Sequence, residues 1–177
     1  PYYNKMWFPM QSKGKDDNGV WKRLCQKLGE YSEELKGKLS DTQLPQSKQE
    51  LSYIVKILRQ YVNDTVYLIV DDYQECASVT LDNLIMEVVD NIDNIHIVLI
   101  SRILPYNIPY EAMFLKGQSV LITQQDLKLT KDEEKVIFKE NEINLTAEEA
   151  DLLYEHTDGW ISAVYLSLYE YKKLGLV

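Results

Sequence analysis

The stretch Val66-Tyr67-Leu68-Ile69-Val70-Asp71-Asp72 decides the fold of this 177-residue chain. Its first five residues are apolar or aromatic, and no polar residue alternates with them. Such a run is typical of a strand that is buried on both faces of a parallel sheet. Because two aspartates end the run, we expect it to place carboxylates at the carboxyl edge of the sheet, where open α/β folds bind their ligands.

A second apolar run, residues 95–100, ends in Ser101 and Arg102 and predicts another strand buried on both faces, with His96 as a core histidine. Ser78 can cap a helix over residues 78–89, which would connect the two strands by a right-handed crossover. If the two strands lay apart with an open gap between them, the backbone amides and carbonyls along their facing edges would be unpaired, which is too costly to persist in buried strands. We therefore expect the two strands to pair directly and in parallel, although a partner chain could instead fill a gap between them.

Strand and helix signals alternate up to about residue 125, and only helix signals follow from Thr130 onward. Apolar spacing predicts four further elements, which are strands over 6–10 and 119–123 and helices over 21–35 and 51–62. Three capping boxes predict helix starts at Ser47/Glu50, Thr130/Glu133 and Thr146/Glu149. The expected fold is an α/β domain over residues 1–125, with a parallel sheet flanked by helices, followed by a small all-helical domain over 126–177.

Carboxylate, hydroxyl and guanidinium groups thus follow two neighbouring strands. Asp71 could hold Mg²⁺, and Asp72 could orient or deprotonate a water that attacks a nucleotide phosphate. Arg102 suits the sensing of a terminal phosphate, because its planar guanidinium binds two oxygens at once, and Ser101 adds a hydroxyl beside it. Each signal also has a plain alternative, which is a solvated loop start or helix cap for the aspartates and a surface ion pair for Arg102.

Together these residues resemble the nucleotide-binding region of MalT/LuxR-type transcription regulators, which are STAND-class ATPases. The resemblance rests on residues 68–73 and on Ile100-Ser101-Arg102 with Pro105 behind it. It continues in the same order through further motifs, which are Trp7 with Asp17-Asn18, Gly117-Gln118, residues 126–130 with Glu133-Glu134, and residues 157–160. The resemblance therefore runs along nearly the whole chain.

The resemblance implies a P-loop NTPase-like sheet with a helical lid, and ATP or ADP with Mg²⁺ as cofactors. It implies roles for six residues: Asp71 as the metal residue, Asp72 as the catalytic neighbour, Ser101 and Arg102 at the phosphate, and Gly159 and Trp160 in the lid near the base or ribose. Related switches often have a proline where this chain has Ile161. The implied partners are other domains or subunits of the same regulator and an inducer or partner protein bound elsewhere, with DNA bound by a separate helix-turn-helix module.

One motif of that family has no counterpart here. The 177 residues contain no Gly-x-x-x-x-Gly-Lys-Ser/Thr loop, and Lys13-Gly14-Lys15 has neither its spacing nor its hydroxyl. Without that loop the β- and γ-phosphates lose their main cradle. We therefore expect a piece of a longer regulator that by itself binds ATP weakly and does not hydrolyse it.

Net charge indicates which partners to exclude, and cysteine content indicates the cellular compartment. Lys and Arg number 19 against 28 Asp and Glu, which gives a formal net charge of −9. Because this field repels phosphate backbones and anionic lipids, we expect neither nucleic acid nor membrane as a partner of this segment. Cys25 and Cys76 are isolated in the sequence, which predicts reduced thiols and a cytoplasmic protein.

Two rival interpretations come from other classes of protein. A phosphoacceptor receiver domain also places two acids at a strand end, but it needs a strand-end lysine and a third strand-end aspartate further along. The following strand instead ends in Ser101-Arg102, which disfavours that class. The other rival is a non-catalytic interaction module built on a degenerate nucleotide-binding fold.

Overall fold

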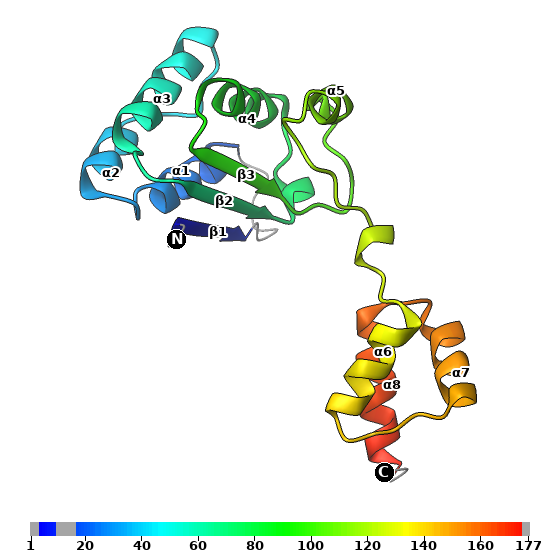
Figure 1. Ribbon diagram of the computed structural model, residues 1–177. Coiled ribbons are helices and arrows are strands. Elements are labelled where there is room, and N and C mark those ends of the chain that lie inside the picture. Colours follow the sequence, from blue (N-terminus) through cyan, green and yellow to red (C-terminus); the bar gives the residue numbers. More distant parts are fainter. Residues whose placement is uncertain (1–3, 10–16, 175–177) are drawn as a thin grey trace. The chain divides into compact units, whose positions relative to one another are not determined.

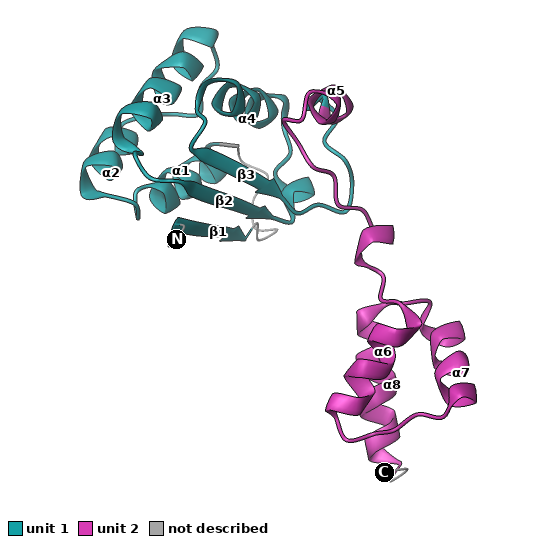
Figure 2. Ribbon diagram, in the orientation of Figure 1, with its two compact units in different colours: residues 1–109 teal, residues 110–177 magenta. Residues whose placement is uncertain are grey.

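The computed structural model describes residues 4–9 and 17–174 of the chain (Figure 1). The chain divides into two compact units, residues 1–109 and 110–177 (Figure 2), each with its own hydrophobic cluster. The Lys13-Gly14-Lys15 stretch lies outside the described residues. The functional division into a nucleotide domain and a lid near residue 125 stays a prediction.

The first unit is a mixed α/β structure around a three-stranded parallel sheet. Its strands are β1 (Asn4–Pro9), β2 (Val66–Asp71) and β3 (Ile95–Leu99), in the order β1-β2-β3. Along the shared register, Val66 lies opposite Ile95 and Val70 opposite Leu99. The predicted direct parallel pairing of the two apolar runs is therefore confirmed.

Four helices supply the rest of the first unit. Three of them lie between β1 and β2, namely α1 (Asp17–Leu28), α2 (Glu33–Ser40) and α3 (Lys48–Tyr61), and α4 (Val79–Asn91) connects β2 to β3. The single helix expected over residues 21–35 is wrong, because Ser32 caps a new helix by accepting a hydrogen bond from the Leu35 amide at 3.1 Å. Gly29 allows α2 to approach the end of α1 closely at this break, since a Cβ at position 29 would lie only 2.9 Å from the Lys36 Cβ.

The helices cover only one face of the sheet. Strand residues such as Phe8, Leu68 and Ile95 join the helices in one buried cluster. On the other face His96 is exposed and stacks on Tyr67 with ring centroids 4.8 Å apart, and Val98 is also exposed. The expectation of a core histidine in a strand buried on both faces is therefore wrong for β3. Right-handed crossovers between strands in sequential order place every connecting helix on the same side.

The second unit is helical in its described part. Its helices are α5 (Tyr110–Leu115), α6 (Lys131–Glu140), α7 (Ala147–Thr157) and α8 (Ile161–Lys173), and the described residues from 130 to 174 contain no strand. The weak strand expected over residues 119–123 is wrong. Val120 and Ile122 are exposed there, and no described strand pairs with the segment. Its backbone hydrogen bond belongs to a turn, in which the Asp126 amide donates to the Thr123 carbonyl oxygen at 3.1 Å, so its β-branched residues form no ladder.

Local helix-start signals agree closely with the structure. All three predicted capping boxes are present, at Ser47, Thr130 and Thr146. Ser78 caps α4 as expected, because its hydroxyl accepts a hydrogen bond from the Leu81 amide at 3.3 Å. None of the helices in the described part of the chain has the length and apolar character that crossing a membrane would need.

The buried thiol of Cys25 predicts a loss of stability at high pH. Burial raises the pKa of Cys25 from 9.0 to about 11, against a smaller lowering by its hydrogen bond with Thr42. Between these values the unfolded thiol ionises while the folded thiol stays protonated, so we expect the free energy of unfolding to be constant below pH 9 and to fall up to pH 11. The expected fall is on the order of 2 kcal/mol. Urea titrations from pH 7 to 11 measure this fall in the free energy of unfolding. The Cys25→Ala variant should lose markedly less stability over this range. An equal loss in both proteins would contradict the attribution of the fall to Cys25.

Candidate functional site

The ends of β2 and β3 bring the predicted acidic pair and the Ser-Arg pair to one edge of the sheet. Backbone pairing continues past the last residue of β3. The Ile100 amide donates to the Val70 carbonyl oxygen at 2.9 Å, and the Tyr73 amide donates to the Ile100 carbonyl oxygen at 2.9 Å. Asp71 and Asp72 therefore emerge beside Ser101 and Arg102, as parallel pairing of the two strands requires.

Asp72 turns the chain sharply at the end of β2. Its φ of 53° places it in the left-handed region, and its amide donates to Asp71 Oδ1 at 3.0 Å. A short 3₁₀ turn, η1 (Tyr73–Glu75), follows directly. Short acidic side chains tolerate this conformation better than most residues. Part of the signal in the acidic pair is therefore explained by turn formation, which was one of the alternatives for these aspartates.

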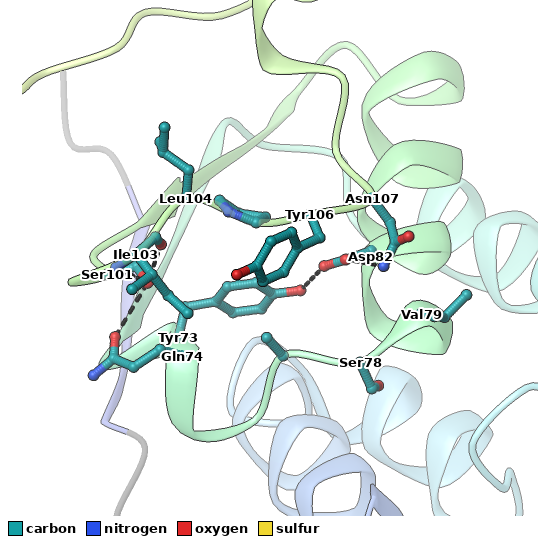
Figure 3. Close-up of a pocket in the computed structure, with 12 residues that line it drawn as sticks. Tyr73, Gln74, Ser78, Val79, Asp82, Ser101, Ile103, Leu104, Tyr106 and Asn107 are labelled. Carbon is teal, nitrogen blue, oxygen red and sulfur yellow. Dashed lines mark hydrogen bonds between the residues drawn. The ribbon is translucent and has the colours of Figure 1, made fainter.

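Gln74 connects the two strand ends, although no sequence pattern singled it out. Its side-chain Nε2 donates to Asp72 Oδ1 at 3.0 Å. Its Oε1 accepts from Ser101 Oγ at 3.1 Å and from the Arg102 amide at 3.1 Å. One amide side chain thus spans from the acidic pair to the Ser-Arg pair, an arrangement that we call the Gln74 bridge (Figure 3 shows its bond to Ser101).

The charged groups of this edge are available to a ligand. Within the described residues, Asp71, Asp72 and Arg102 form no ion pair, and the Arg102 side chain is exposed. No group of three or more His, Cys, Asp or Glu side chains in the described part of the chain could hold a metal ion alone. Two carboxylates still fit Mg²⁺ that arrives with a nucleotide, because protein sites for Mg²⁺ commonly supply one or two carboxylates and leave the other positions to phosphates and water.

A buried polar cluster anchors the turn that carries Gln74. Asp82 of α4 is 2% exposed and accepts hydrogen bonds from the Tyr73 hydroxyl and from Asn107 Nδ2, the latter at 3.0 Å (Figure 3). Burial, together with the hydrogen bond to Asp82 and its negative charge, raises the pKa of Tyr73 well above its usual value. Asp82 therefore ties η1, α4 and the segment after β3 into one piece.

A small pocket lies beside the bridge. Its volume is about 190 Å³, and Tyr73, Gln74, Asp82, Ser101 and Asn107 are among the residues that line it (Figure 3). Ligand pockets of roughly 300–1,000 Å³ are usual for drug-sized molecules. The pocket is too small for a whole nucleotide, so a nucleotide would have to lie along the open edge of the sheet.

Gly159 and Trp160 belong to the second unit, where the local backbone explains why position 159 is a glycine. Its φ is +77°, and a Cβ on it would lie 2.5 Å from the Leu129 carbonyl oxygen. Its own carbonyl oxygen accepts from the Leu129 amide at 2.8 Å. Trp160 precedes α8 and is 42% exposed. Gly159 is therefore required by the packing of residues 128–129, whether or not it contacts a ligand.

Comparison with known proteins adds no assignment to this geometry: no protein-family model matches the chain, and no curated protein is significantly similar to it.

The sequence carried only weak signals for the residues that it did not single out. Gln74 follows the acidic pair by two residues but belongs to no periodic pattern. Asp82 stands beside the apolar stripe of α4, next to Leu81 and ahead of Ile85, and an acid at the border of such a stripe can be recognised as a buried candidate.

Proposed function

We propose that this chain is part of the ATP-dependent switch of a MalT/LuxR-type transcription regulator, a STAND-class relative of the P-loop NTPases. The observation that carries the proposal is the common edge at which β2 and β3 end, where Asp71 lies beside Asp72 and Gln74 joins Asp72 to Ser101 and Arg102. The motifs along the rest of the chain support it through their order. A cytoplasmic location and partners within the same regulator belong to the same proposal.

Each residue of the edge has a role in this proposal. Asp71 would hold Mg²⁺, and Asp72 would orient or deprotonate the attacking water. Arg102 would bind the terminal phosphate with Ser101 beside it, while Gly159 and Trp160 would serve the lid near the base or ribose. Bound Mg²⁺ would supply charge neutralisation at the phosphates. The chain contains no phosphate-loop motif, so the proposal assigns that loop to another part of the regulator.

The 177-residue chain alone is expected to bind Mg·ATP weakly or not at all, since it lacks the backbone amides and lysine of a phosphate loop. Isothermal titration calorimetry on the purified chain measures this. A dissociation constant in the low micromolar range, on the order of −8 kcal/mol of binding free energy, would overturn the expectation.

In the full-length regulator, Asp71→Asn and Asp72→Asn are expected to lower ATP turnover by roughly a hundredfold, because each replaces a carboxylate that metal binding or proton transfer needs. Steady-state hydrolysis assays measure the loss. Asp93→Asn is the matched control, since Asp93 is an exposed aspartate between α4 and β3. Wild-type turnover in both site variants would show that the acidic pair serves only the turn.

A non-catalytic interaction module is the second candidate, favoured by exposed apolar side chains. Those that follow β3 or lie in the second unit include Ile103, Leu104, Tyr106, Val120, Leu121 and Ile122. Within each unit these exposed apolar residues are close together in sequence, and contiguous exposed apolar side chains often mark protein-binding surfaces. A full-length protein that binds no ATP would favour this candidate over the switch.

A further inference from the structure

Gln74 is the only described side chain with hydrogen bonds to both strand ends of the candidate site. Its Nε2 donates to the Asp72 carboxylate, and its Oε1 accepts from Ser101 Oγ and from the Arg102 amide. An amide can donate and accept at once, whereas a carboxylate accepts only and a thioether does neither with comparable strength. Among side chains of this length, glutamine is therefore the one that can make both the Nε2 and the Oε1 hydrogen bonds, which we call the two arms of the bridge.

We propose that Gln74 is a positioning residue, which holds Asp72 and the Arg102 backbone in one arrangement so that both strand ends meet a nucleotide phosphate together. This inference rests on the proposed nucleotide-dependent function. It goes beyond it by assigning a role to a residue that touches neither metal nor phosphate in that function.

The segment after β3 needs such a support. Residues 100–104 belong to no helix or strand, and Gln74 Oε1 is the acceptor that the structure gives the Arg102 amide. Gln74 is itself well held, because the adjacent Tyr73 is buried and bonded to Asp82. Catalytic groups need placement to within about 0.5 Å, so a fixed bridge between a carboxylate and a phosphate-sensing arginine affects the rate more than it affects affinity.

Amide hydrogen exchange in the 177-residue chain tests the bridge itself. Gln74→Met removes both arms at nearly constant length and should raise the exchange rate of the Arg102 amide roughly tenfold. Gln74→Glu keeps the acceptor and should leave that rate near the wild-type value. Gln60→Met is the matched control, because Gln60 is an exposed residue of α3. An unchanged Arg102 rate in Gln74→Met would overturn the bridge.

Kinetics of the full-length regulator test the positioning role. Gln74→Met is expected to lower kcat for ATP hydrolysis about tenfold while KM stays within about twofold, because ground-state binding does not depend on the arrangement that only the reaction needs. Gln60→Met should match the wild type in both constants. Because a smaller folded fraction also lowers apparent kcat at constant KM, kcat is calculated per folded molecule, with the folded fraction measured by circular dichroism. A wild-type kcat per folded molecule would show that the role of Gln74 is purely structural.

The outcomes separate this inference from the proposed function. Loss of turnover in Asp71→Asn with wild-type kcat in Gln74→Met would overturn the positioning role and leave the proposed function standing. Absence of ATP binding by the wild-type full-length protein would overturn both. A selective fall in kcat in Gln74→Met, with faster exchange at Arg102, supports the inference.

Discussion

Replacing Asp82 with alanine is expected to lower the free energy of unfolding of the first unit by about 3 kcal/mol. Asp82 is 2% exposed, and both of its oxygens accept hydrogen bonds, from the Tyr73 hydroxyl and from Asn107 Nδ2. The alanine variant leaves the Tyr73 hydroxyl, whose residue is 2% exposed, without its acceptor, whereas the exposed Asn107 can bond water instead. Urea unfolding followed by the fluorescence of the buried Trp21 measures the loss.

Two comparisons show whether the loss comes from this cluster. Asp90→Ala removes an exposed aspartate from the same helix and should change stability by less than about 0.5 kcal/mol. Tyr73→Phe should be clearly destabilising alone but nearly harmless when Asp82 is already alanine, because the two residues share one interaction. Additive effects of the two substitutions would contradict the cluster.

Gly159→Ala is expected to destabilise the second unit by about 2–4 kcal/mol. The backbone φ of +77° disfavours any side chain, and the new Cβ would lie 2.5 Å from the Leu129 carbonyl oxygen, a backbone atom that cannot turn aside. Thermal unfolding followed by circular dichroism and by the fluorescence of Trp160 measures the effect.

Two other glycines separate conformational strain from the clash. Gly117 has a φ of +70°, and a Cβ added there would meet nothing within 4 Å, so Gly117→Ala should cost only about 1 kcal/mol. Gly37 lies in α2 with open space around it, and Gly37→Ala should stabilise by about 0.5–1 kcal/mol. Equal effects at Gly159 and Gly117 would show that the approach to Leu129 is not a real constraint.

Local sequence signals predicted where most helices and strands begin, but they did not determine which faces of the sheet the helices cover. Ser47, Thr130 and Thr146 start helices through bonds within one turn, so their neighbours in sequence suffice. The apolar run of β3 gave no sign that Val98 would be exposed, because composition does not tell how many faces are covered. That depends on strand order and crossover direction, which are properties of the whole unit.

The candidate site shows the same division. The position of Asp71 and Arg102 at one edge was predictable, because Asp71 ends one apolar strand, Arg102 follows the next, and parallel strands end at one edge. Gln74 was not, because its importance comes from reaching residues 27 and 28 positions away in sequence. Gly159 was assigned to a ligand by resemblance alone, and the structure adds a packing reason at Leu129 that no local pattern displays.

The most direct measurement is a calorimetric titration of ATP into the full-length protein, with Mg²⁺ and then with EDTA. We expect one saturable site per chain with a dissociation constant on the order of micromolar, weakened at least about tenfold by EDTA, by Asp71→Asn and by Arg102→Ala. Binding that is absent, or that is unchanged in both variants, would contradict the assignment of this sheet edge to a Mg·nucleotide.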